Sequence, residues 1–89
     1  MPYIPKSDRK KFAAVLWAAE LAMKEHGISN GELNFLMTSL GLLYLRRHGN
    51  SYNTITDVKK TLREAADEFS RRLLAPYEDT KIIQNGDVY

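Results

Sequence analysis

Cysteine is absent from this chain of 89 residues. Without it the protein has no disulfide, no thiolate nucleophile, no iron–sulfur cluster and none of the usual zinc sites. A chain without cysteine fits a reducing compartment, so we expect a cytoplasmic protein.

Long hydrophobic runs are also absent. No stretch approaches the ~18 consecutive apolar residues that a membrane-spanning helix needs, so we expect no membrane partner. The segment KSDRKKFAAVLWAA has the basic start and apolar run of a secretory signal, but the run is short and continues into Glu20 and Lys24 on a helical face. We therefore interpret this segment as part of a helix.

A large excess of one charge is missing too. Thirteen Lys and Arg oppose eleven Asp and Glu, and the resulting net charge of +2 makes nucleic acid the less favoured partner. The charges are nevertheless unevenly placed, because residues 6–11 are basic and residues 78–87 are acidic. These two segments could meet within one chain or between chains.

The sequence has few residues in arrangements that carry chemistry. His26 and His48 each precede a glycine and have no second ligand three or four positions away, so they are interpreted as helix-end residues. There is no glycine-rich nucleophile turn and no phosphate loop. The acidic cluster at residues 64–68 is explained by pairs with neighbouring Lys and Arg along a helix. We expect no metal, no cofactor and no enzymatic activity.

The apolar residues that are present predict one all-α domain over residues 1–89, with three helices. Apolar positions recur at helical spacing, and glycines or capping residues separate the segments at about 8–26, 30–48 and 51–75. Ser29 and Glu32 form a capping-box pattern at the second start. The second helix is apolar around most of its circumference, which indicates that it is covered on more than one side. Two flanking helices could provide this cover, and a second subunit would provide it more comfortably.

The third helix is predicted to be the longest and to extend beyond the other two. Its seam steps at heptad spacing through Ile55, Val58, Leu62, Ala65 and Phe69 and then Arg72 or Leu73. Such an overhanging seam also favours self-association. Pro76 is expected to end this helix. The remaining residues, 76–89, are expected to form an ordered tail with a short hairpin at Asn85-Gly86.

Pairs of basic residues and flat tyrosine rings suggest an anionic ligand. The pairs are Arg46-Arg47, Lys59-Lys60 and Arg71-Arg72, and guanidinium groups bind phosphate in a forked geometry while tyrosines can stack on a base. Together they fit a nucleotide or a nucleic-acid backbone better than an acidic or apolar ligand. The candidate ligand-binding residues are Arg71, Arg72, Tyr77, Tyr89, Tyr52 and Arg47.

Several short stretches resemble one known family. They are MPYI at the start, GELNFL at the second helix, and APYEDTKI followed by NGDVY at the end. The chain resembles, over nearly its whole length, a family of small phage and bacterial proteins classed as a domain of unknown function. The resemblance implies a stand-alone, all-helical accessory protein, without an activity to carry over. The sequence departs from that pattern at Ser39, Ser70 and Lys59-Lys60.

Three functions remain open. The first is a non-enzymatic, phage-type homo-oligomer that binds a nucleotide-like ligand where subunits meet and sequesters a host immune signal in the host cytoplasm. Arg71, Arg72 and the tail tyrosines would then line the junction. The second is a nucleic-acid-binding or regulatory helical protein in which the second and third helices, joined through RRHGNSY, resemble a helix-turn-helix. The third is an adaptor that holds another protein.

Overall fold

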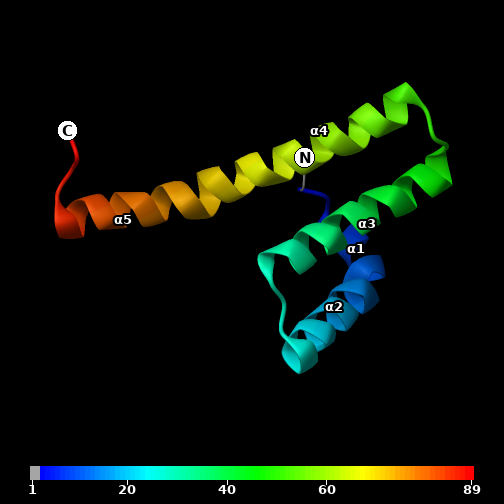
Figure 1. Cartoon of the computed structure of the whole chain (residues 1–89), viewed down its shortest axis with the longest axis horizontal. Helices are drawn as coiled ribbons and strands as arrows, with labels where there is room; N and C mark the ends of the chain where they lie inside the picture. Colours follow the sequence, from blue (N-terminus) through cyan, green and yellow to red (C-terminus); the bar gives the residue numbers. More distant parts are fainter. Residues whose placement is uncertain (1–2) are drawn as a thin grey trace.

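Three continuous helical stretches make up the fold, and the computed structural model describes residues 3–89. Within these residues there is no strand, so the prediction of an all-α protein with a long third helix is confirmed. Met1 and Pro2, part of the N-terminal segment MPYIP, lie outside the described residues. The stretches are α1 (Lys6–Arg9), η1 (Lys10–Phe12) and α2 (Ala13–His26); then α3 (Asn30–His48); then α4 (Tyr52–Phe69), η2 (Ser70–Leu74) and α5 (Ala75–Asn85) (Figure 1).

Side-chain caps determine where α3 and α4 begin. The Ser29 hydroxyl accepts a hydrogen bond from the backbone N–H of Glu32 at 3.2 Å, and the Glu32 carboxylate accepts one from the backbone N–H of Ser29 at 2.9 Å. Ser51 and Thr54 form the equivalent pair at α4. Each pair satisfies two N–H groups that the first helical turn leaves without a partner. The predicted capping box at Ser29 is therefore confirmed.

The Ser29 cap makes the stability of α3 depend on pH. Hydrogen bonds from the backbone and the side chain of Ser29 lower the pKa of Glu32 below its ordinary value of 4.5. A carboxylate whose pKa is lower in the folded state stabilises that state above its unfolded pKa, and this contribution is lost as the pH falls through the folded value. We expect Glu32→Gln, which keeps the cap but cannot ionise, to abolish the part of the acid destabilisation that begins below about pH 4.5. Thermal unfolding of both proteins between pH 3 and 7 measures this difference, and identical pH profiles would contradict it.

Helices α3 and α4 lie side by side and antiparallel, with a close approach at Gly41 (Figure 1). A Cβ atom placed on Gly41 would lie 2.8 Å from Cγ1 of Val58. Only a residue without a side chain allows the two helices to come this near at that position. Two shallow apolar grooves flank the contact, one beside Leu42 and Leu45 and the other beside Met37 and Tyr44.

The third stretch continues through the position where the sequence predicted its end. Pro76 is the second residue of α5, and the helical path runs over residues 52–85. The turn before Pro76 is π-helical, and the backbone N–H of Ala75 donates to the carbonyl of Ser70, five residues earlier. This wider turn relieves the clash that a proline ring makes with the preceding turn of an α-helix. The expectation that Pro76 ends the helix is therefore wrong.

The expected hairpin at Asn85-Gly86 is also wrong, because Asn85 is the last residue of α5 and Gly86 caps it. The φ angle of Gly86 is +86°, and its N–H donates to the carbonyl of Ile82 at 2.9 Å. Glycine adopts a positive φ without a steric penalty, and both helix C-termini and hairpin turns use it. Only residues 86–89 follow the helix.

The structure has no closed core. None of the residues 3–89 is buried, and 26 large hydrophobic side chains among them are exposed. The Cα radius of gyration is 16.8 Å, compared with about 12 Å for a compact domain of this length. The accessible surface is 8211 Å², compared with about 5,300 Å² for a folded monomer of this mass. A single chain therefore leaves about 2,900 Å² more surface in water than a typical monomer does.

Candidate functional site

The six candidate ligand-binding residues fall in separate places along the chain. Arg47 is in the last turn of α3 and Tyr52 is the first residue of α4, so these two lie at the same end of the α3–α4 hairpin. Arg71 and Arg72 are in η2, about 28 Å along the helix from Tyr52. Tyr77 is in α5 and Tyr89 lies beyond the end of that helix. A single chain does not bring the six residues together.

Arg71 and Arg72 are linked through Tyr3, a residue that the sequence analysis did not select. The Tyr3 hydroxyl accepts hydrogen bonds from Nη2 of Arg71 at 2.9 Å and from Nη1 of Arg72 at 3.2 Å, and it donates to the Glu68 carboxylate. Arg71 also pairs with Glu68 through its Nε at 3.0 Å and its Nη2 at 2.9 Å. This cluster, Tyr3–Glu68–Arg71–Arg72, fastens the N-terminal segment to the middle of the long helix. The only signal in the sequence is that Tyr3 stands in the extended N-terminal segment, where an aromatic side chain is free to reach another element.

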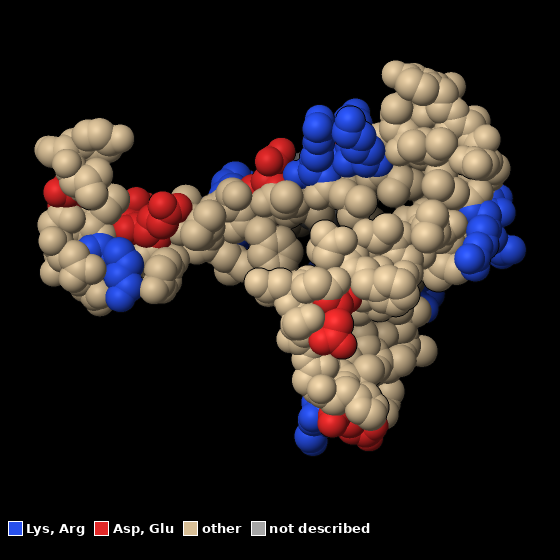
Figure 2. Space-filling view, viewed as in Figure 1, with Lys and Arg blue, Asp and Glu red and all other residues tan. Residues whose placement is uncertain are grey.

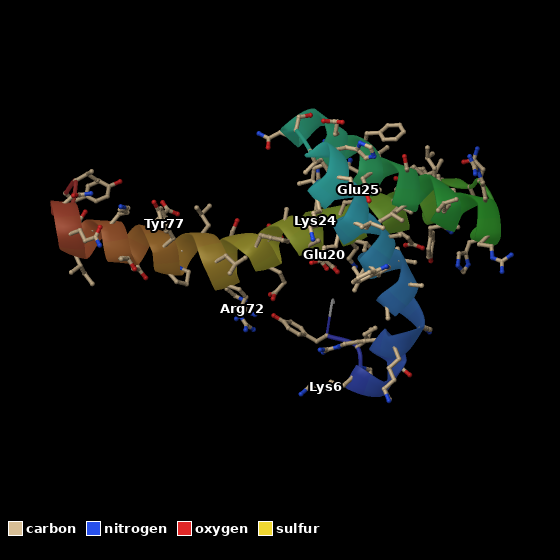
Figure 3. The ribbon with its side chains drawn as sticks, turned by 90° about the horizontal axis from the view of Figure 1, so that it is seen from below. Lys6, Glu20, Lys24, Glu25, Arg72 and Tyr77 are labelled. Atoms are coloured by element: carbon tan, nitrogen blue, oxygen red, sulfur yellow. The ribbon has the colours of Figure 1, made fainter. Side chains whose placement is uncertain are left out.

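Arg72 and Tyr77 point in different directions. Five positions along an ideal helix correspond to a rotation of about 140°. Figure 3 shows the Arg72 side chain directed toward the N-terminal segment and Tyr77 on the other side of the helix. Tyr77 instead lies near Lys81, whose ammonium nitrogen is 5.6 Å from the centre of the ring. The predicted junction of Arg71 and Arg72 with the tail tyrosines is not formed within one chain.

Removing the Tyr3 hydroxyl should release the N-terminal segment. Tyr3→Phe loses the acceptor for both arginines and the donor to Glu68, but it keeps the Glu68–Arg71 ion pair. We expect a loss of about 0.5–1 kcal/mol in stability, because the contacts are exposed. We also expect faster tryptic cleavage after Lys6. Tyr52→Phe is the matched control, since Tyr52 is 81% exposed; equal cleavage rates in the two variants would show that the Tyr3 contacts do not hold the segment.

A basic surface begins at the end of the α3–α4 hairpin and continues along α4. Over residues 46–63, five Lys and Arg side chains stand against one acidic residue, Asp57. Figure 2 shows basic side chains gathered at the end of α3 and over the middle of α4. Lys59, Lys60 and Arg63 line a shallow depression of about 300 Å³ on α4. Exposed cations next to an exposed tyrosine ring provide forked hydrogen bonds, a local positive potential and a stacking surface.

Neither Arg46 nor Arg47 is paired with an acidic side chain within the described chain, whereas Arg71 is neutralised by Glu68. The ring of Tyr44 stacks on His48 at 4.1 Å between centres, next to these arginines. The candidate residues lie in three places: the hairpin end, the Tyr3 cluster and α5 with the residues after it. At the hairpin end, Arg47 and Tyr52 are close in the chain, and Arg47 has no ion pair with a described acidic residue.

The described part of the chain, residues 3–89, contains neither a cluster of potential metal ligands nor a helix able to span a membrane. Among residues 3–89, no three potential ligands of the His, Cys, Asp or Glu type come together. His26 and His48 lie in the last turns of α2 and α3, where the sequence placed them. Within the same residues, the helices are too short or too polar to cross a bilayer.

Helix α2 meets α3 across an open apolar groove. The groove measures about 790 Å³ and is lined from α2 by residues such as Leu16, Ala19 and Met23, and from α3 by Phe35 and Leu36. Phe35 remains 72% exposed. Apart from His26 and Glu32, the latter engaged in the Ser29 cap, the lining residues are apolar or glycine, so the groove offers surface for packing more than polar groups that orient a small ligand.

Fold and surface together define a small all-α protein with an uncovered apolar interior, a basic hairpin end and a long projecting helix. The chain belongs to the family described as Domain of unknown function (DUF6899), whose model matches residues 1–88. No curated protein and no solved structure is similar enough to count as a match.

Proposed function

We propose that the protein is a subunit of a non-enzymatic homo-oligomer that binds an anionic, nucleotide-like ligand. The observation that carries the proposal is the missing core: none of the residues 3–89 is buried in the single chain. Burial of apolar surface is the main favourable term in folding, so a chain without a core requires a partner. An obligate interface buries about 2,000–5,000 Å² in total, which two copies with this much excess surface can supply.

The ligand part of the proposal is supported by the basic hairpin end. Arg47, Tyr52 and the cations of α4 favour a phosphate-bearing molecule with a flat base, because the guanidinium binds the phosphate and the ring stacks. In this proposal the protein is a phage-type accessory protein that sequesters a host immune nucleotide in the cytoplasm. The place of binding differs from the sequence-based expectation, since Arg71 and Arg72 already serve the cluster with Tyr3 and Glu68.

The test is a titration of the full chain with cyclic dinucleotides, ADP-ribose and ATP, followed by calorimetry and native mass spectrometry. We expect saturable binding of at least one of these, weakened at least tenfold by Arg47→Ala, equal to about 1.4 kcal/mol. Arg9→Ala is the matched control, because Arg9 is an exposed arginine on α1, outside residues 46–63. A flat titration across the whole panel would overturn the ligand proposal.

The structure does not favour the nucleic-acid alternative in its helix-turn-helix form. The two helices of that motif cross at about 90–120°, whereas α3 and α4 lie antiparallel and side by side (Figure 1). The adaptor alternative is an outcome of the same titration: an oligomer that gains no nucleotide mass would favour a protein partner for the groove between α2 and α3.

A further inference from the structure

Two guanidinium groups converge on one oxygen atom in the Tyr3 cluster. Nη2 of Arg71 lies 2.9 Å and Nη1 of Arg72 lies 3.2 Å from the hydroxyl oxygen of Tyr3. Proteins use guanidinium donors arranged in this way to hold an oxygen atom of a phosphate or a carboxylate. Here the position is taken by a hydroxyl oxygen of the chain itself, which is a weaker acceptor than an anion.

The two arginines differ in their other contacts. Arg71 forms an ion pair with Glu68, through Nε at 3.0 Å and Nη2 at 2.9 Å. Within residues 3–89, Arg72 forms no ion pair, and its hydrogen bond goes to the Tyr3 hydroxyl. Two arginines against one glutamate leave the cluster with one net positive charge. A bound anion would balance this charge, which the neutral hydroxyl does not.

The donors of the cluster are accessible from the solvent. The side chain of Arg71 is 62% exposed, and Tyr3 is 48% exposed. Figure 3 shows the side chain of Arg72 directed outward from the long helix, toward the N-terminal segment. An anion therefore reaches both guanidinium groups without a rearrangement of the long helix, provided that Tyr3 leaves. Exposed contacts of this kind contribute little to stability, so they are easily exchanged.

We infer that Arg71 and Arg72 form a phosphate-binding site that Tyr3 keeps closed. A phosphate oxygen takes the place of the Tyr3 hydroxyl oxygen, and residues 3–5, which we call the strap, are released from the long helix. Binding and release are coupled: an anion that binds only the open site also opens it, and loosening the strap tightens binding by the same factor. The site is separate from the hairpin end and requires no second subunit.

Glu68 selects the kind of anion. Its carboxylate accepts a hydrogen bond from the Tyr3 hydroxyl. Inorganic phosphate near neutral pH still carries a hydroxyl group, so it can accept from both arginines and donate to Glu68, as Tyr3 does. Sulfate has only acceptor oxygens, and the phosphate of a nucleoside monophosphate has lost its last proton above about pH 6. Either would leave Glu68 facing an anion without a proton between them. The ligand is therefore free inorganic phosphate.

A titration of the full chain with inorganic phosphate tests the site. We would follow the side-chain Nε–H signals of Arg71 and Arg72 by NMR at pH 7, with chloride holding the ionic strength constant. We expect saturable shifts in wild type and binding about two- to fivefold tighter in Tyr3→Phe, since the strap no longer competes. Tyr52→Phe, the matched control, should bind as wild type does. Arg72→Gln should bind at least fivefold more weakly, and so should sulfate and AMP with the wild-type chain.

Release of the strap has its own readout. Tryptic cleavage after Lys6 should be faster in phosphate than in chloride at equal ionic strength for wild type. Tyr3→Phe should be cleaved fast in both salts, because its strap is already free. A small peptide substrate, cleaved in the same two solutions, corrects for any effect of phosphate on trypsin itself.

Each contrary result overturns a stated part of the inference. Arginine signals that do not respond to phosphate, in wild type or in Tyr3→Phe, would overturn the site. Equal affinity of wild type and Tyr3→Phe would overturn the strap, and equal binding of sulfate would overturn phosphate as the ligand. If Arg72→Gln loses its helical circular dichroism, Arg72→Lys, which keeps the charge but not the fork, replaces it with the same expected direction. Failure of the nucleotide proposal is seen separately, through Arg47→Ala.

Discussion

Phe35→Asp is expected to convert the protein from a folded assembly into a largely unfolded monomer. Phe35 lies on α3, lines the groove between α2 and α3, and is 72% exposed in the single chain. For a protein that works as a monomer, replacing so exposed an aromatic residue with a carboxylate would be neutral or would improve solubility. If the groove is covered in an assembly, the same change buries an unpaired charge.

The expected effect of this charge is large. Burying an unpaired carboxylate costs several kcal/mol, and about 3 kcal/mol already weakens association more than 100-fold. Because the chain has no core of its own, lost association should also lower its helical content. Sedimentation and circular dichroism at equal concentrations measure both effects. Asn34→Asp adds the same charge at the neighbouring position of α3 and should leave association and helical content unchanged. Equal behaviour of Phe35→Asp and Asn34→Asp would contradict a covered groove.

Gly41→Ala is expected to destabilise the α3–α4 hairpin, whereas Gly31→Ala is expected to stabilise α3. Both glycines lie in the same helix, and alanine in a helix is favoured over glycine by about 0.5–1 kcal/mol. At Gly31 the nearest atom to an added Cβ is the Ser29 hydroxyl, at 3.9 Å. At Gly41 it is Cγ1 of Val58, at 2.8 Å. Valine is fixed in one rotamer in a helix, so the backbones must separate.

Overpacking of this kind costs about 1–3 kcal/mol, which exceeds the gain in helix propensity. Urea unfolding of the two variants should therefore shift the midpoint in opposite directions. Val58→Ala added to Gly41→Ala removes the clashing methyl group and should recover part of the loss, which a purely local effect of residue 41 would not allow. Equal stabilisation by both alanines would show that the close approach of α3 and α4 does not contribute to stability.

The parts of the fold that could be predicted are those fixed by local chemistry. Ser29 with Glu32 defines the start of α3, because the hydrogen bonds of a capping box join residues three apart. The long third helix was predicted from the heptad steps of its seam. The density of apolar residues in α3 indicated that this helix needs cover on more than one side, and Phe35 is 72% exposed in the single chain.

The parts that could not be predicted depend on geometry beyond the nearest turn. Pro76 usually ends a helix, but here the π-helical turn of residues 70–74 accommodates it, and no residue type marks such a turn in the sequence. Asn85-Gly86 fits both a hairpin and a helix end, since both require a positive φ. The apolar run before it was too short to distinguish strand from helix.

The candidate site also has a part that the sequence could predict and a part that depends on the tertiary arrangement. The sequence identified the residue types suited to an anion, Arg47 and Tyr52 among them, but distances along the chain do not show which of them gather. The ion pair of Arg71 with Glu68 agrees with the expected pairing along the helix, because the two residues are three positions apart. The bridge through Tyr3 could not be foreseen, because only the return of the N-terminal segment to the long helix brings Tyr3 there.

The most direct test of the central claim is the mass of the wild-type chain in solution, measured by sedimentation equilibrium from nanomolar to micromolar concentrations. The account predicts a mass of two or more times 10.2 kDa at micromolar concentration, with helical content that decreases as dilution separates the copies. A species of 10.2 kDa that stays helical and unfolds cooperatively at a temperature independent of concentration would contradict it.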